Sequence, residues 1–269
     1  MGNCTISILY RPILVGVLLA FCMSNGWAKA DAPLSTTEMV NLLSTIDDRQ
    51  RNGGDYKVTA YLEQKEAGKD QLAYEMTIFR RDENDLLMML FQKPKIEAGK
   101  GYLRLKRNLF IYDPTVGKWE RRTERERIGG TGSRRSDFDE SRLAEEFDPS
   151  YVGLEKLGKH SVHHLKLTAK PGVDVGYPTV DLWIDRDTKN ILKTQDRALS
   201  GKLMRTSYYP KWQRFHSKSK GTDVYFPKRI HIFDEVEKEN QTQVIFKDVD
   251  LSPLPRNIFT KAWLESRSR

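Results

Sequence analysis

Histidine is the residue type in this chain that most readily binds metals, and three of its five histidines lie close together. His160, His163 and His164 fall on a segment with the alternation of a β-strand. Residues in a strand rise about 3.3 Å each and alternate between faces, so His160 and His164 would stand about 13 Å apart while His163 points away. Side chains placed in this way do not form one chelate. His216 and His231 have no potential ligands nearby, and we therefore predict no metal site.

The usual signatures of an active site do not occur in the sequence. The glycine loop, residues 129–133, lacks the Lys-Ser/Thr ending of a nucleotide-binding loop. There is no Gly-x-Ser-x-Gly nucleophile motif. Asp137 and Asp139 stand where a helix is expected to begin, and acidic residues there suit the helix dipole without any catalytic role. We therefore predict no catalytic residue, no cofactor and no enzymatic activity.

An arginine-rich stretch surrounds the glycine loop and could bind an anion or a protein partner. Glu120, Glu124 and Glu126 interleave with the arginines, so much of the positive charge is neutralised locally. An exposed strand and loop would have the same composition, and the sequence leaves both interpretations open. The candidate patch consists of Arg121, Arg122, Arg134 and Arg135.

Large apolar side chains recur at strand spacing and could line a lipid-binding cavity. The default role of each is in the core. A wide antiparallel sheet with few helices, however, has a large apolar face to cover. If helices cover it incompletely, the gap can hold an acyl chain, and flexible Met side chains would suit a variable ligand. The candidate lining residues are Met76, Met88, Phe91, Leu105, Trp119, Phe138, Leu143, Phe147 and Trp183.

The elements that would position these residues are mostly strands. Alternation predicts eleven of them, at residues 56–62, 72–78, 86–91, 101–112, 118–123, 163–170, 179–185, 191–199, 202–209, 223–233 and 241–249. Short connections between them favour a large antiparallel sheet, open or partly closed.

Helices are expected at three places. Residues 36–51 have helical apolar spacing, with Ser35 or Thr36 as the N-cap. Residues 137–147 are expected to form a central helix capped by Ser136, with Phe138, Leu143 and Phe147 on the side that closes the cavity. The glycine loop before it could act as its hinge. A short helix could also follow Phe259.

The N-terminus predicts export. Arg11, an apolar stretch from Pro12 to Met23 and the small residues of Ala28-Lys29-Ala30 have the order of a secretory signal peptide. Lipidation of Cys22 is the alternative, but the bulky Phe21 stands where that cleavage requires a small residue. We therefore predict a signal peptide over residues 1–30, cleavage near Ala30, and one soluble periplasmic domain over residues 31–269 without cysteine.

The charge of the chain limits its partners. The formal net charge is +8, and cleavage removes two of these positive charges with Arg11 and Lys29. Because an exported chain seldom meets nucleic acid, anionic lipid head groups or acidic protein surfaces are the expected partners. A surface whose charges only keep the protein soluble would have the same composition.

Several short segments follow one another in a fixed order along the chain. They are Asp113-Pro114 with Trp119-Glu120-Arg121, Tyr177 to Asp185, Leu199 to Leu203, Phe226-Pro227-Lys228, Phe246 with Asp248-Val249, Phe259-Thr260 and Leu264-Glu265. Taken together, from about Thr36 to Glu265, the chain resembles the LolA-like outer-membrane lipoprotein-sorting protein family. The family's usual Gly-Thr-Asp-Phe-Ser-Tyr-Glu-Asp-Leu segment stands here as residues 135–143, of which Asp137, Phe138 and Leu143 agree.

This resemblance implies an incomplete, curved antiparallel barrel with helices as a lid over an apolar cavity. It also implies carriage of lipoproteins or other acylated lipids across the periplasm, because an exposed acyl chain does not cross water unaided at a useful rate. We therefore expect a monomeric, non-enzymatic carrier that takes part in lipoprotein sorting. The alternative is a lipid-sensing envelope regulator or an accessory subunit of an inner-membrane exporter or transporter complex.

Overall fold

The computed structural model describes residues 1–2, 32–106, 108–123 and 125–268. The chain divides into two units, residues 1–32 and 33–269, and the second contains every element described below. The predicted signal peptide, with Cys22 and the cleavage site at Ala30, lies outside the described residues apart from residues 1 and 2.

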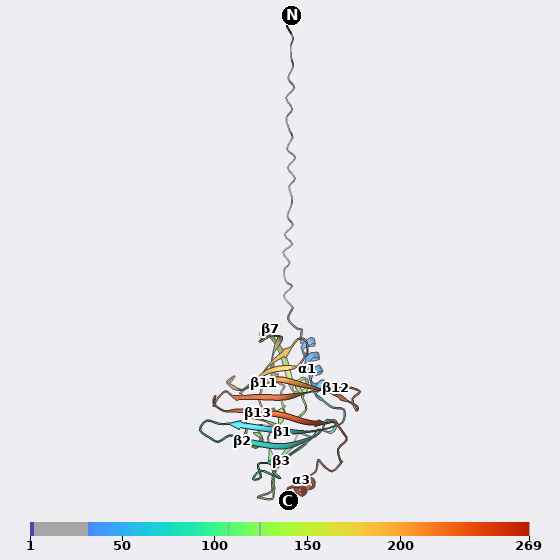
Figure 1. Cartoon of the computed structure of the whole chain (residues 1–269), viewed down its shortest axis with the longest axis vertical. Helices are drawn as coiled ribbons and strands as arrows, with labels where there is room; N and C mark the ends of the chain where they lie inside the picture. The colour runs from blue at the N-terminus through green and yellow to red at the C-terminus, as the bar shows by residue number, and fades with distance from the viewer. Residues whose placement is uncertain (3–31, 107, 124, 269) are drawn as a thin grey trace. The chain divides into compact units, whose positions relative to one another are not determined.

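The second unit is built on one antiparallel sheet, in which the described residues form thirteen strands (Figure 1). The strands are β1 Asp55–Lys65, β2 Leu72–Arg81, β3 Leu86–Lys93, β4 Gly101–Leu105, β5 Asn108–Asp113, β6 Lys118–Arg122, β7 Phe147–Leu157, β8 His160–Ala169, β9 Thr179–Asp185, β10 Ile191–Arg197, β11 Leu203–Ser217, β12 Thr222–Asp234 and β13 Gln241–Asp250. The predicted antiparallel fold is confirmed.

The order of the strands reveals two meanders joined at one seam. The order is β6-β5-β4-β3-β2-β1-β13-β12-β11-β10-β9-β8-β7, so β1 pairs with β13 and the first meander continues into the second. The strands at the two ends, β6 and β7, do not pair with each other, and the described sheet is therefore open. We call the face that carries the two larger core clusters the inner face, and the opposite one the outer face.

Two helices cover different faces of this sheet. Helix α1 Thr36–Gln50 begins with a capping box between Ser35 and Glu38, and its Met39, Leu43 and Ile46 pack with inner-face side chains of β8–β10. Helix α3 Lys261–Arg267 is capped by Thr260. Its Leu264 packs with Ile258 and Phe259 on the outer face of β2–β4. The cap predicted at Ser35 is confirmed.

The structure corrects three sequence-based boundaries. Residues 101–112 form two strands, because the chain turns back after Lys106, which has a left-handed backbone (φ 55°). Strand β7 was not predicted. The prediction of a central helix over residues 137–147 is wrong. Arg135–Asp137 form one 3-10 turn, and Ser136 lies inside this turn rather than capping a helix. Helix α2 spans only Leu143–Glu146. Proline disfavours helix at the residue before it, so Pro149 helps to end α2 and begin β7.

Candidate functional site

The inner face is packed solid over β1–β5. The segment that links the two meanders crosses this half and buries Ile128 and Phe138 in the same core cluster as Met76 and Phe91. Phe91 meets Tyr74 edge-on, with ring centroids 5.6 Å apart. The glycine loop is part of the packing: a Cβ at Gly132 would lie 2.8 Å from the Thr242 hydroxyl, and Thr131 and Ser133 are fully buried. This packing disagrees with the prediction that the glycine loop acts as a hinge.

Over β9–β12 the inner face is hollow. A cavity of about 180 Å³ lies between the sheet and a segment that we call the lid, residues 135–147. Its apolar lining comes from the sheet through Val180, Leu182, Ile191, Tyr209, Trp212, Phe226 and Ile230, and from the lid through Phe138, Leu143 and Phe147.

The size of the cavity limits what it holds as it stands. Pockets for drug-sized ligands measure about 300–1,000 Å³, and an apolar cavity of about 150 Å³ holds a ligand the size of benzene. The present 180 Å³ therefore accepts a small apolar group but not a long acyl chain. A longer ligand requires the lid to move away from the sheet.

One end of the lid is fastened by a buried ion-pair group on β10 and β11. Arg205 donates from Nη1 to Asp137 of the lid at 2.8 Å and from Nε to Asp196 at 2.6 Å. Asp137 also accepts from the backbone N–H of Arg134 at 2.8 Å. Although burial opposes it, the two carboxylates raise the pKa of Arg205 above its ordinary value. The guanidinium therefore stays charged and holds the lid.

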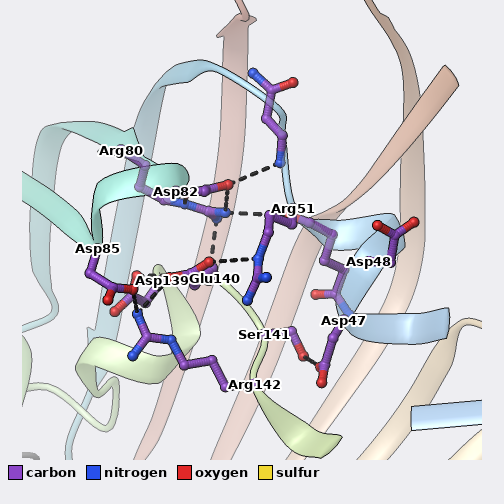
Figure 2. Close-up of polar contacts among 12 residues, drawn as sticks. Asp47, Asp48, Arg51, Arg80, Asp82, Asp85, Asp139, Glu140, Ser141 and Arg142 are labelled. Atoms are coloured by element: carbon purple, nitrogen blue, oxygen red, sulfur yellow. Dashed lines mark hydrogen bonds and ion pairs between the residues drawn. The ribbon is translucent and has the colours of Figure 1, made fainter. Parts of the chain in front are cut away.

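The middle of the lid is fastened by a second ion-pair group, drawn in part in Figure 2. Arg104 donates to Asp139 at 2.8 Å, and Arg51 approaches Glu140 at 2.9 Å. Arg142 of the lid pairs with both Glu140 and Asp85 (Figure 2). Burial and the nearby Arg142 lower the pKa of Arg104 to about 10, so it remains a cation at neutral pH.

Helix α1 supplies the third attachment of the lid. The Asp47 carboxylate accepts from the Ser141 hydroxyl at 2.5 Å (Figure 2). It also accepts from the N–H groups of Leu143 at 2.9 Å and Ala144 at 2.8 Å. It thereby caps the single turn of α2. Burial raises the pKa of Asp47, while its hydrogen bonds act in the opposite direction. Polar contacts therefore fasten the lid along its whole length.

The candidate lining residues separate into three places. Phe138, Leu143 and Phe147 line the cavity, although they do not lie on one helix. Met76 and Phe91 lie in the solid half of the inner face. Met88, Leu105 and Trp119 pack on the outer face with the α3 cluster, and Trp183 stacks on His164 with ring centroids 4.1 Å apart. The structure thus brings only the first group to the cavity.

The sequence analysis missed most of the cavity wall, and one signal could have found it. In β9, Val180 and Leu182 alternate with Asp181 and Trp183. The carboxylate of Asp181 marks the outer side of the strand, where it pairs with Arg197 at 2.8 Å. Alternation therefore assigns Val180 and Leu182 to the inner face and Trp183 to the outer one.

The predicted arginine patch is not gathered at one place. Arg135 is buried and pairs with Asp139. Arg134 lies over the Tyr177 ring, 4.6 Å from its centroid, and Arg122 pairs with Glu120 at 2.7 Å. Arg121 is exposed on β6. At least three of the four are therefore engaged within the molecule.

Two negative findings hold for the described residues. Among the residues whose placement is described, no group of three or more His, Cys, Asp or Glu side chains could hold a metal ion. Within the same residues, no helix has both the length and the apolar character needed to cross a membrane.

Comparison with solved structures identifies the fold. The chain superposes on a LolA superfamily protein from Nitrosomonas europaea with a TM-score of 0.72 at 20% identity, covering 86% of this chain and 99% of that one. A domain described as an outer-membrane lipoprotein-sorting protein, from Vibrio parahaemolyticus, gives 0.73 at 18% identity, covering 84% and 97%. A DUF1329 family protein from Desulfovibrio piger gives 0.75 at 15% identity, covering 85% and 98%.

Sequence comparison identifies the family. A search of curated proteins finds no significant match to this sequence. A family model described as an uncharacterized protein family matches residues 83–266, which is more than half of the chain. The chain therefore belongs to this family of uncharacterized proteins, and its fold is that of the LolA superfamily.

Proposed function

We propose that this protein is a non-enzymatic carrier that binds the acyl chain of a lipoprotein or another lipid in the cavity under the lid. The observation that carries the proposal is the contrast between the two sides of that cavity. Its sheet side is mostly apolar and includes Val180, Leu182 and Ile191, with charged Asp196 and Arg205 where the lid is attached. The lid itself is fastened by ion pairs and hydrogen bonds. An apolar ligand could displace such a lid, and of the lid residues only Phe138 would leave the core cluster of the solid half.

The energies involved support a lid that opens for an acyl chain. Burial of a methylene contributes about 0.8 kcal/mol, so a 16-carbon chain contributes roughly 11 kcal/mol. Removing one partner of a buried ion pair costs about 3–5 kcal/mol, and this value is an upper bound for a lid opening that returns the separated charges to water. Binding of a long chain therefore offsets the loss of two such pairs, and a chain of six carbons offsets one at most.

The proposal includes the compartment and the role. Residues 1–30 would be an export signal, and residues 31–269 would work in the periplasm as a monomer that receives an acylated molecule at one membrane and releases it at another. The described fold of the Vibrio parahaemolyticus relative, a lipoprotein-sorting domain, supports this role. No cofactor is needed for it, since the ligand is bound and released unchanged.

Mass spectrometry of the gently purified protein tests the proposal. We expect a mass excess that matches an acylated molecule and is lost in Leu143→Glu, because this change puts a charge on the cavity wall. The matched control is Leu72→Glu, which changes an exposed leucine outside the cavity and should retain the ligand. Wild-type protein that carries no acyl ligand and takes up no fluorescent fatty acid would refute the carrier function.

A further inference from the structure

A row of three basic residues crosses the outer face of the sheet at its centre. Lys211 of β11 stands directly opposite Arg229 of β12, and Arg229 stands opposite Ile245 of β13. Lys247 is two residues beyond Ile245 on the same face, where its ammonium lies 4.7 Å from the centroid of the Tyr61 ring. Opposite residues lie about 5 Å apart and diagonal ones about 7–8 Å. We call Lys211, Arg229 and Lys247 the outer basic row.

The outer basic row lacks the carboxylate partners that other cations of this protein have. Arg104 and Arg205 are buried against aspartates, and Lys93 in the neighbouring meander pairs with Glu75 at 2.8 Å. All three residues of the row are exposed, and no carboxylate of the described residues lies within ion-pair distance of them. Two acids follow Lys247 on β13, Asp248 and Asp250, and neither is within ion-pair distance of the row. Asp250 lies opposite Lys57, whose charge helps to lower the pKa of that aspartate after its bonds to Ser252.

This arrangement is electrostatically unfavourable in the free protein. Like charges directly opposite each other on two strands destabilise a sheet, and Lys211 faces Arg229 in this way. The positive charge of the row also acts on His231. Burial lowers the pKa of this histidine, and the charge of Arg229 lowers it further. An external anionic surface would remove the repulsion.

We propose that the outer basic row is a docking site for anionic phospholipid head groups at a membrane surface. Protein interfaces need a buried apolar anchor and are depleted in lysine, whereas this row contains two lysines beside the half-buried Tyr61 and Ile245. Strand pairing across β11, β12 and β13 holds the three cations on one face, with an irregular register on either side of Lys211. Basic residues at an anionic bilayer bind weakly and reversibly, as a protein that moves between membranes requires.

Sedimentation with lipid vesicles tests the inference. The probe is vesicles of phosphatidylcholine with about 30% phosphatidylglycerol, compared with pure phosphatidylcholine, at low salt. The variant Lys211→Gln/Arg229→Gln/Lys247→Gln should bind the anionic vesicles about 100-fold more weakly than the wild type, since each lost cation weakens such binding about fivefold. The matched control changes three exposed lysines elsewhere, Lys118→Gln/Lys156→Gln/Lys159→Gln, and should lose less than threefold.

The vesicle experiment distinguishes failure of the docking site from failure of the proposed carrier function. Leu143→Glu, which alters the cavity, should bind the vesicles as the wild type does, and physiological salt should weaken binding because it screens exposed charges beyond about 8 Å. Equal affinity of the wild type for both vesicles, or equal losses in the two triple variants, would overturn the docking site. Loss of vesicle binding in Leu143→Glu alone would also overturn it, because the contact would then be lipid uptake.

Discussion

The two halves of the inner face differ in what closes them. Over β1–β5, the linking segment lies directly on aromatic side chains: a Cβ at Gly129 would stand 3.3 Å from the Phe91 ring, which itself meets Tyr74 edge-on. Over β9–β12, the lid is held by Asp47, Asp139 and other polar groups, and a cavity remains beneath it. The same sheet therefore combines a solid core with a cavity whose cover is attached by ion pairs and hydrogen bonds.

Truncating an aromatic side chain in each half should give the largest difference. Phe91→Ala should lower the free energy of unfolding by about 3–5 kcal/mol, because its ring is packed on all sides. Phe147→Ala should cost clearly less, since its ring already borders the cavity. Urea denaturation measures both changes. Equal losses would mean that the two halves are packed alike.

Removing one attachment of the lid should have an intermediate effect. In Asp137→Ala, Arg205 keeps Asp196, so we expect a loss of roughly 1–3 kcal/mol together with faster uptake of a fluorescent fatty acid. Glu120→Ala is the control, because it removes an ion pair at the exposed edge strand β6 and should cost less than about 1 kcal/mol. Unchanged uptake kinetics in Asp137→Ala would exclude this pair from lid opening.

Enlarging a side chain in each half sharpens the comparison further. Ile191→Phe should fill part of the cavity, weaken fatty-acid binding at least tenfold and change stability by less than about 1 kcal/mol, since space is available. Val58→Phe in the solid half should cost about 1–3 kcal/mol and leave binding unchanged. Calorimetric titration and thermal unfolding give both quantities. A destabilised Ile191→Phe that still binds ligand would contradict a preformed cavity.

The smallest expected effect is a change in pH dependence at the contact between lid and α1. The folded-state pKa of Asp47 is raised above its unfolded value, so the folded protein binds more protons there than the unfolded chain. This contribution is fully present below the unfolded pKa near 3.8 and is lost as pH rises through the folded value. The stability of the wild type relative to Asp47→Asn should therefore fall as pH rises from the acid side. A constant difference across that range would show that Asp47 is not perturbed.

Sequence patterns located most strands because alternation and turn residues act locally. Strand β9 was predicted with its observed bounds, since Pro178 precedes it and a polar turn follows. The turn after Lys106 was missed because a lysine in the left-handed region has no signature in the sequence. Strand β7 was missed because its Pro149 and Gly153 are typical of loops, and an edge strand tolerates them.

The site was less predictable than the fold because its parts meet only through the tertiary structure. Phe138, Leu143 and Phe147 were selected from helical spacing. In the structure, Phe138 directly follows a 3-10 turn, Leu143 begins the single turn of α2, and Phe147 begins strand β7. Asp139 and Glu140 override the helical tendency of this segment, because they pair with arginines from distant elements. Trp183 was assigned to the cavity from its size and its strand spacing, whereas its alternation with Val180 and Leu182 places it on the outer face.

Photo-crosslinking with a diazirine-labelled palmitate tests the central claim, that the hollow half of the inner face binds an acyl chain beneath the lid. Peptide mass spectrometry of the irradiated protein should find adducts on segments that contain Leu143, Val180 and Trp212, and unlabelled palmitate should suppress them. Adducts confined to the solid half around Met76 and Phe91, or labelling that unlabelled palmitate leaves unchanged, would contradict the account.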